Sequence, residues 1–141
     1  MSRALVDTDI LSEILKNRDP VVTREAASYL ATHGEFTVSV ISVMEIAYGL
    51  HRGGRTKQLE AFEATLRATC NVLSFDTEMA LLAGRIEAEL ETVGSVIDAP
   101  DVMIAAAAMR AGLPVVTGNT THFEAIRRVG YALAIENWRR T

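Results

Sequence analysis

Short runs of aliphatic and β-branched residues alternate along this chain with longer segments whose apolar residues recur at helical spacing. Such alternation favours a mostly parallel sheet, because a parallel strand needs a crossover, usually helical, from its neighbour. We therefore expect an α/β fold, a three-layer α/β/α domain that spans residues 1–141 with four to five strands. The expected strands are 4–6, 36–41, 72–75, 114–116 and 131–135, and the expected helices are 8–15, 20–33, 42–50, 56–69, 77–92 and 100–111.

The composition of the chain argues against several classes of function and against a membrane location. The net charge of −4 at pH 7 argues against non-specific nucleic-acid binding through a basic surface. Cys70 is the one cysteine, so no disulfide can form within the chain, which suits a reducing compartment. The first residues lack a signal-peptide pattern, and the longest apolar stretch, Val102–Met109, is too short to cross a bilayer. We therefore expect a cytoplasmic protein with no membrane partner.

Three carboxylates stand where predicted strands end or a predicted helix begins. Asp7 follows the first strand, Glu45 lies just past the second, and Asp101 precedes an apolar helical stretch. The carboxyl ends of parallel strands gather at one edge of a sheet, so these acids are expected to converge. Converged carboxylates repel one another unless a cation lies between them. Oxygen ligands suit a hard cation, so the sequence predicts a Mg²⁺ or Mn²⁺ site and points to phosphodiester chemistry.

Each acid also has a purely structural interpretation. Asp7 can cap the helix that follows it, and Ser42 with Glu45 fits a capping box in which Glu45 bonds the Ser42 amide. The Ser42 hydroxyl would otherwise orient Glu45 or a water bound by the metal. Asp98 is interpreted as a cap, with Pro100 in the first turn of its helix. Helix N-termini favour carboxylates, so capping and metal binding are compatible.

Further polar residues accompany these acids in the expected fold. Asp9 either faces the same cleft as Asp7 or is a favourable charge in the first helical turn. Thr117 and Asn119 follow the fourth strand, and Asn119 can offer an oxygen to a metal ion or its water, or support a turn. His122 belongs to the same segment, expected to be a loop. It either contacts phosphate and moves a proton, or is a surface residue.

Four segments, in the same order, resemble the motifs of PIN-domain ribonucleases. Within that family the pattern is most similar to VapC, the toxin of type II toxin–antitoxin pairs. The similarity extends over nearly the whole chain, and the ordered set of motifs is specific. The segments are Leu5–Glu13, Val38–Gly49, Asp101–Ala106 and Val116–Phe123, and the ending Ile135–Trp138 is also typical.

This resemblance implies a PIN fold and a Mg²⁺- or Mn²⁺-dependent endoribonuclease that leaves 5′-phosphate and 3′-hydroxyl ends. It also implies a homodimer, a VapB-type antitoxin as inhibitor, and a toxin–antitoxin hetero-oligomer that binds operator DNA through the antitoxin. By motif position Asp7, Glu45 and Asp101 are the metal-binding acids, and Asn119 takes the fourth, often acidic, position. Asp9 stands where many members have asparagine, so the charge of the site would stay similar.

An RNA substrate requires local positive charge and a protein partner requires an apolar surface. Arg52, Arg55 and Lys57 flank a Gly-Gly pair and form either a mobile phosphate clamp or a solvated loop between helices. The arginine pairs 127–128 and 139–140 are candidates for contact with RNA or an acidic antitoxin segment. A further set of apolar residues forms either core or a groove for an antitoxin helix: Leu11, Ile14, Leu15, Ile46 and Leu50.

Two other functions remain open on the sequence. A phosphatase of the haloacid dehalogenase type would use Asp7 as a covalent nucleophile and Thr117 to bind phosphate. That chemistry also needs a lysine and a late acidic pair, whereas Glu124 and Glu136 are the only acids after Thr117 and no lysine follows. The second alternative is a PIN module that binds RNA or a protein without cutting, which the complete set of acids disfavours.

Overall fold

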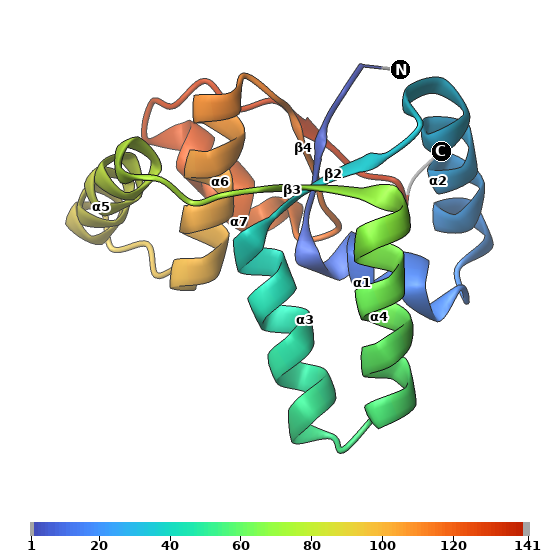
Figure 1. Ribbon diagram of the computed structural model, residues 1–141. Coiled ribbons are helices and arrows are strands. Elements are labelled where there is room, and N and C mark those ends of the chain that lie inside the picture. The colour runs from blue at the N-terminus through green and yellow to red at the C-terminus, as the bar shows by residue number, and fades with distance from the viewer. Residues whose placement is uncertain (1, 140–141) are drawn as a thin grey trace.

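The computed structural model describes residues 2–139 and shows a five-stranded sheet between two layers of helices (Figure 1). The strand order is β3-β2-β1-β4-β5, and each of the four pairings is parallel. The strands are β1 Leu5–Val6, β2 Phe36–Ser39, β3 Cys70–Leu73, β4 Val115–Val116 and β5 Ile135–Glu136. The helices are α1 Thr8–Lys16, α2 Pro20–His33, α3 Val40–Arg52, α4 Thr56–Thr69, α5 Thr77–Thr92, α6 Ala99–Ala111 and α7 Thr120–Arg128. The predicted α/β/α fold with a parallel sheet is confirmed.

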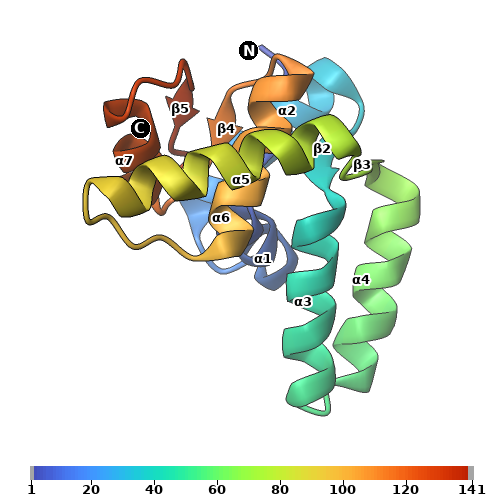
Figure 2. The same cartoon turned by 90° about the vertical axis from the view of Figure 1, so that its left-hand side faces the viewer.

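The two faces of the sheet are buried against different helices. Successive side chains of a strand point to opposite faces, and β1 follows this rule. Leu5 packs into a cluster with α5, α6 and α7, whereas Val6 packs into a cluster with α1 and α2. Helix α6 is buried along most of its length because it carries an unbroken apolar stretch over residues 102–109. The α3–α4 hairpin extends away from the sheet in both views (Figures 1 and 2).

Several expected boundaries were wrong, each for a local reason. Helix α3 begins at Val40 rather than at residue 42, because the Ser39 side chain caps it by accepting the Ile41 N–H at 3.1 Å. The segment expected to be a loop after residue 119 is helix α7, whose Phe123 and Ile126 are buried at helical spacing. The third and fifth strands are Cys70–Leu73 and Ile135–Glu136, instead of 72–75 and 131–135.

The strand order fixes where a site can form. Strand β1 lies between β2 and β4, and the chain builds the sheet outward from β1 on one side before it returns to β4 on the other. The crevice at the carboxyl ends of β1 and β4 is therefore a topological switch point, where parallel sheets bind ligands. Asp7 and Thr117 are the residues that directly follow these two strands. Within residues 2–139, no helix is long and apolar enough to cross a membrane.

Candidate active site

Asp7 is a buried carboxylate at the switch point, with 2% of its surface exposed. Its Oδ1 accepts the Thr8 backbone N–H at 2.8 Å, so the predicted helix cap is confirmed. Its Oδ2 accepts the Thr117 hydroxyl at 2.7 Å, which joins the ends of β1 and β4. Burial, together with the negative charges of Asp9 and Asp101, raises the pKa of Asp7 to about 7 despite these two bonds. The folded chain therefore disfavours the charged form of Asp7, and a cation placed beside it would favour that form.

Glu45 is oriented by a hydroxyl chain rather than by a capping box. The predicted box is wrong because Ser39, not Ser42, caps α3. The Thr8 hydroxyl donates to Glu45 Oε1 at 2.6 Å and lies 2.8 Å from the Ser42 hydroxyl. Thr8 has one hydroxyl hydrogen, which Glu45 takes, so Ser42 donates to Thr8. Ser42 thus acts on Glu45 only through Thr8, a residue that the sequence interpretation had not assigned to the site.

Burial also raises the pKa of Glu45, and the charges of Asp101 and Asp98 add to that effect. Asp98 occupies the N-cap position of α6 but makes no capping hydrogen bond with its side chain. Its predicted role as a cap is therefore wrong, and its carboxylate instead lines the same cavity as Glu45.

Asp101 is held by two residues of the segment after β4. Asn119 Nδ2 donates to Asp101 Oδ2 at 3.1 Å, and His122 Nδ1 lies 2.6 Å from the same oxygen. Helix α7 makes this possible, since it begins next to Asn119 and turns His122 back towards the acid. His122 therefore contacts the candidate site through Asp101.

Asp9 supports the turn that carries Asn119. Its Oδ2 accepts the Gly118 N–H at 2.9 Å, and its Oδ1 is 3.5 Å from the Thr117 hydroxyl. Burial raises the pKa of Asp9, and the negative charge of Asp101 acts in the same direction. The two backbone N–H bonds that Asp9 accepts and the positive charge of Arg139 oppose this shift.

A cavity of about 700 Å³ opens over these groups, and five carboxylates line it: Asp7, Asp9, Glu45, Asp98 and Asp101. Arg52, Arg55 and Lys16 line it from the side of α1 and the α3–α4 turn. Arg52 and Arg55 thus lie where the sequence predicted, whereas Lys57 is not among the lining residues. Lys16 had not been predicted, since no local pattern marks the last turn of α1 as part of the site.

The acidic cavity offers candidate ligands for a metal ion. Five carboxylates line it, and burial raises the pKa of three of them, Asp7, Asp9 and Glu45. Carboxylate oxygens are the ligands that a hard divalent cation prefers. No three His, Cys, Asp or Glu side chains of the described residues are arranged to bind one ion as they stand. The donors fit such an ion by type and charge, and the side chains would have to turn towards one another to bind it.

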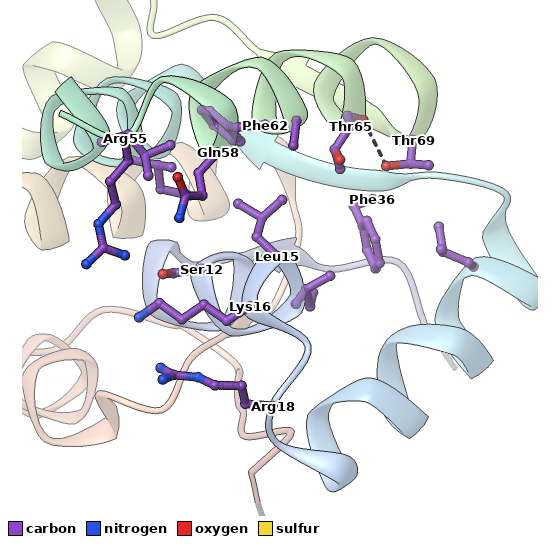
Figure 3. A pocket seen from close by; sticks show the side chains of 15 residues that line it. Ser12, Leu15, Lys16, Arg18, Phe36, Arg55, Gln58, Phe62, Thr65 and Thr69 are labelled. Carbon is purple, nitrogen blue, oxygen red and sulfur yellow. Dashed lines mark hydrogen bonds between the residues drawn. The ribbon is translucent and has the colours of Figure 1, made fainter. Parts of the chain in front are cut away.

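A second cavity, of about 740 Å³, lies beside the first and is mainly apolar (Figure 3). Its apolar wall is formed by Ile14, Leu15, Leu30, Phe36, Ile46, Leu50 and Phe62. Leu11, which we had grouped with this set, is core instead, with 0% exposed. Ser12, Lys16 and Arg55 line both cavities, so the apolar cavity continues into the acidic one.

Comparisons with known proteins agree with this geometry. The sequence model described as PIN domain matches residues 4–129, so the chain belongs to the PIN-domain family. It is 33% identical over 138 residues to the tRNA(fMet)-specific endonuclease VapC of Shigella flexneri, covering 98% of this chain and 99% of the relative. The predicted resemblance to VapC proteins is thus confirmed.

Solved structures show the same fold. A chain in the crystal structure of DNA-bound VapBC from Salmonella typhimurium matches with a TM-score of 0.81 and 31% identity, over 98% of this chain and 99% of that one. A chain of VapBC2 from Rickettsia felis, bound to a DNA fragment from its promoter, also has a TM-score of 0.81. At 22% identity, over 97% of this chain and 99% of that one, this second match shows the fold alone.

Proposed function

We propose that this chain is an endoribonuclease toxin of the VapC type, that it depends on Mg²⁺ or Mn²⁺, and that residues 1–141 act as a single PIN domain in the cytoplasm. The observation that carries the proposal is the approach of Asp7, Glu45 and Asp101 to one cavity without a lysine or arginine within 4.0 Å among the described residues. Burial and mutual repulsion disfavour the charged forms of Asp7 and Glu45, and a bound cation would relieve both effects. The relatives named as ribonucleases support the class of reaction.

In this proposal Asp7, Glu45 and Asp101 hold the cation, directly or through water. A divalent ion held there would activate water for attack on phosphorus and neutralise charge on the phosphate. The chain's own task is orientation: Thr117 fixes Asp7, and Thr8 fixes Glu45. Asn119 and His122 both bond Asp101 Oδ2, which directs the other carboxylate oxygen to the cation.

Substrate binding is assigned to the cationic side of the same cavity. Lys16, Arg52 and Arg55 face the acids across it, so a phosphate between the two sides would meet cationic side chains. The relatives in Shigella flexneri and Salmonella typhimurium are named as specific for tRNA(fMet), so initiator tRNA is the first substrate to test.

The apolar cavity is assigned to the antitoxin. An amphipathic helix of a VapB-type partner would place its apolar face against Leu15 (Figure 3) and the likewise partly exposed Ile14 and Leu50. Because Lys16 and Arg55 also border the acidic cavity, a chain seated there would reach the site and block RNA. The neighbours described as DNA-bound VapBC support an assembly that binds operator DNA through the antitoxin.

A homodimer is assigned to the outer face of α3. Val40, Met44 and Tyr48 recur at four-residue spacing and are 39%, 57% and 66% exposed, so they form one apolar stripe. Such a stripe is costly to leave in water, and a second copy of the chain would cover it.

The test is cleavage of initiator tRNA, with a mixed RNA pool beside it, by the purified chain in Mg²⁺, in Mn²⁺ and in EDTA. The matched variants are Asp7→Asn and Asp101→Asn, with Glu87→Gln on the exposed face of α5 as a control that removes a charge elsewhere. We expect discrete metal-dependent cuts with 5′-phosphate ends, absent from the two site variants and retained by the control. Full activity of a folded Asp7→Asn protein would contradict the proposal.

The alternatives give different results in the same experiment. RNA binding without cuts, at metal concentrations that calorimetry shows to saturate the site, would favour the non-catalytic module. Release of phosphate from small phosphomonoesters without RNA cleavage would favour the phosphatase, which the PIN-family match already disfavours.

A further inference from the structure

Arg139 lies among acids at the edge of the candidate site, although the sequence suggested RNA or antitoxin contact for it. Its Nη1 is 3.4 Å from Glu13 Oε1 and 3.6 Å from Asp19 Oδ2. These acids belong to α1 and to the cap of α2, so the guanidinium ties the end of the described chain to its beginning. Arg140, the other half of the predicted pair, lies outside the described residues.

Gly118 lets Arg139 approach Asp9. A Cβ at position 118 would stand 2.7 Å from both Arg139 Nε and Asp9 Oδ2, a separation that real Cβ atoms essentially never show. Gly118 does not have a positive φ, so glycine is required here for space rather than for conformation. The Gly118 N–H also donates to Asp9 Oδ2 at 2.9 Å. The guanidinium and the Asp9 carboxylate therefore lie on either side of a backbone that only glycine leaves open, close enough for the arginine's charge to act on Asp9.

Arg139 is surrounded by more negative charge than it carries positive charge, and this attraction holds its side chain in place. Asp9, Glu13 and Asp19 act on one guanidinium, and Glu13 Oε2 is buried without a hydrogen-bond partner among the described residues. Removing Arg139 would leave the partly buried Glu13 and Asp19 carboxylates without the guanidinium that contacts them, which is unfavourable. The guanidinium is thus already engaged by acids of its own chain.

We propose that Asp9 and Arg139 form an electrostatically coupled pair, on either side of Gly118, that fixes the Thr117–Asn119 turn and sets the net charge that the acidic cavity presents to a cation. The inference rests on the proposed metal-dependent function. Asp9 accepts the turn's N–H and lies close enough to Asp7 and Asp101 to affect both electrostatically. Arg139 cancels this charge without contacting the cation site. Both are positioning residues, and Asp9 is not a ligand.

The first experiment measures Mn²⁺ affinity by calorimetry on the full chain. Arg139→Gln should tighten binding by roughly three- to tenfold, because it exposes the Asp9 charge to the ion, and Asp9→Asn should weaken binding by a similar factor. The double variant should return close to wild type. Arg67→Gln, which removes a charge from the exposed face of α4, should leave the affinity unchanged. The pair would be overturned if Arg139→Gln and Asp9→Asn changed the Mn²⁺ affinity in the same direction. It would also be overturned if wild type bound Mn²⁺ and neither variant changed the affinity.

RNA cleavage separates this inference from RNA contact by Arg139. If Arg139 bound phosphate, Arg139→Gln would raise KM and reduce the salt slope of RNA binding by about one, with unchanged Mn²⁺ affinity. The pair instead predicts an unchanged KM and salt slope, with kcat lowered by the loosened turn and restored towards wild type by adding Asp9→Asn.

Unfolding in EDTA tests the pair without metal. The cycle of Asp9→Asn, Arg139→Gln and the double variant should show a coupling of roughly fivefold or more in the unfolding equilibrium constant. Gly118→Ala should destabilise the wild type more than it destabilises Arg139→Ala, where the clash with the guanidinium is absent and only the clash with Asp9 Oδ2 remains. If wild type neither binds Mn²⁺ nor cuts RNA, the proposed function is refuted, and the coupling measured in EDTA still tests whether Asp9 and Arg139 act as a pair. If the effects in the cycle are additive, the pair is refuted and the proposed function is not affected.

Discussion

Asp7→Asn removes a charge that folding buries, and it should therefore stabilise the metal-free protein at the pH where it abolishes activity. The carboxylate is 2% exposed, and each of its oxygens already has a hydrogen-bond donor. Asparagine keeps the acceptor for the Thr8 N–H, so the cap of α1 survives, and its amide can donate to the Thr117 hydroxyl. The variant thus differs from wild type mainly in charge.

The size of the effect follows from the pKa of Asp7, which is about 7 in the folded chain against an ordinary value of 3.8 for an aspartate. Between these values the unfolded chain has released a proton that the folded chain still holds, so the free energy of unfolding falls as pH rises. The loss is absent well below pH 4 and complete above pH 7. At about 1.4 kcal/mol per pH unit, the loss reaches roughly 4 kcal/mol.

Urea unfolding in EDTA at pH 5 and pH 8 measures this difference. Asp7→Asn should be more stable than wild type by roughly 4 kcal/mol at pH 8, and the gain should shrink by about 3 kcal/mol at pH 5, two pH units below the pKa of Asp7 in the folded chain. Glu87→Gln, an exposed acid, should show no such pH dependence. The reasoning would be refuted if the stability difference between Asp7→Asn and wild type were the same at pH 5 and pH 8. It would also be refuted if Asp7→Asn were less stable than wild type at pH 8. Adding Mg²⁺ should stabilise wild type more than the variant, because only the intact site binds it well.

Three further variants test the core, the RNA surface and the dimer. Ile104→Ala, in the fully buried part of α6, should lower the free energy of unfolding by roughly 2 to 5 kcal/mol. Val96→Ala, at a side chain that is 93% exposed, should lower it by less than about 0.5 kcal/mol, and equal losses for the two variants would contradict the burial of Ile104. Lys16→Gln should raise KM for RNA and reduce the salt slope by about one without changing kcat; an unchanged salt slope would remove Lys16 from the RNA surface. Tyr48→Glu should convert the dimer to monomer in sedimentation experiments, and a dimer of unaltered strength would exclude the α3 stripe.

The architecture could be predicted because its signals are local and repeated. The bounds of α4 and α5 follow from apolar spacing and flanking breaks, and the structure has them as predicted. Helix α7 was missed because it is short and polar on average, with only Phe123 and Ile126 directed inward. The start of α3 was misplaced because Ser39 and Ser42 are both plausible caps, and only the tertiary contact of Ser42 with Thr8 decides between them.

The acids of the site could be predicted, but not how each of them is held. The sequence identifies the acids by their positions after strands or before a helix, and these acids are Asp7, Glu45 and Asp101. Their partners do not, since a threonine hydroxyl can serve any acid that the fold brings near. The Arg139–Asp9 approach joins the two ends of the chain and depends on a missing side chain at Gly118, for which no local pattern exists.

These partners divide the acids into two groups, and the division is itself an argument about function. Hydroxyl and backbone N–H groups hold Asp7, a hydroxyl holds Glu45, and an amide and an imidazole hold Asp101. Hydroxyl, amide and backbone donors orient a carboxylate without cancelling its charge, so that charge stays available to a cation. Asp9 differs from these three acids, because Arg139 lies close to it across Gly118. In the proposed function, the acid with an arginine beside it positions the backbone, and the three acids without an arginine or lysine bind the metal.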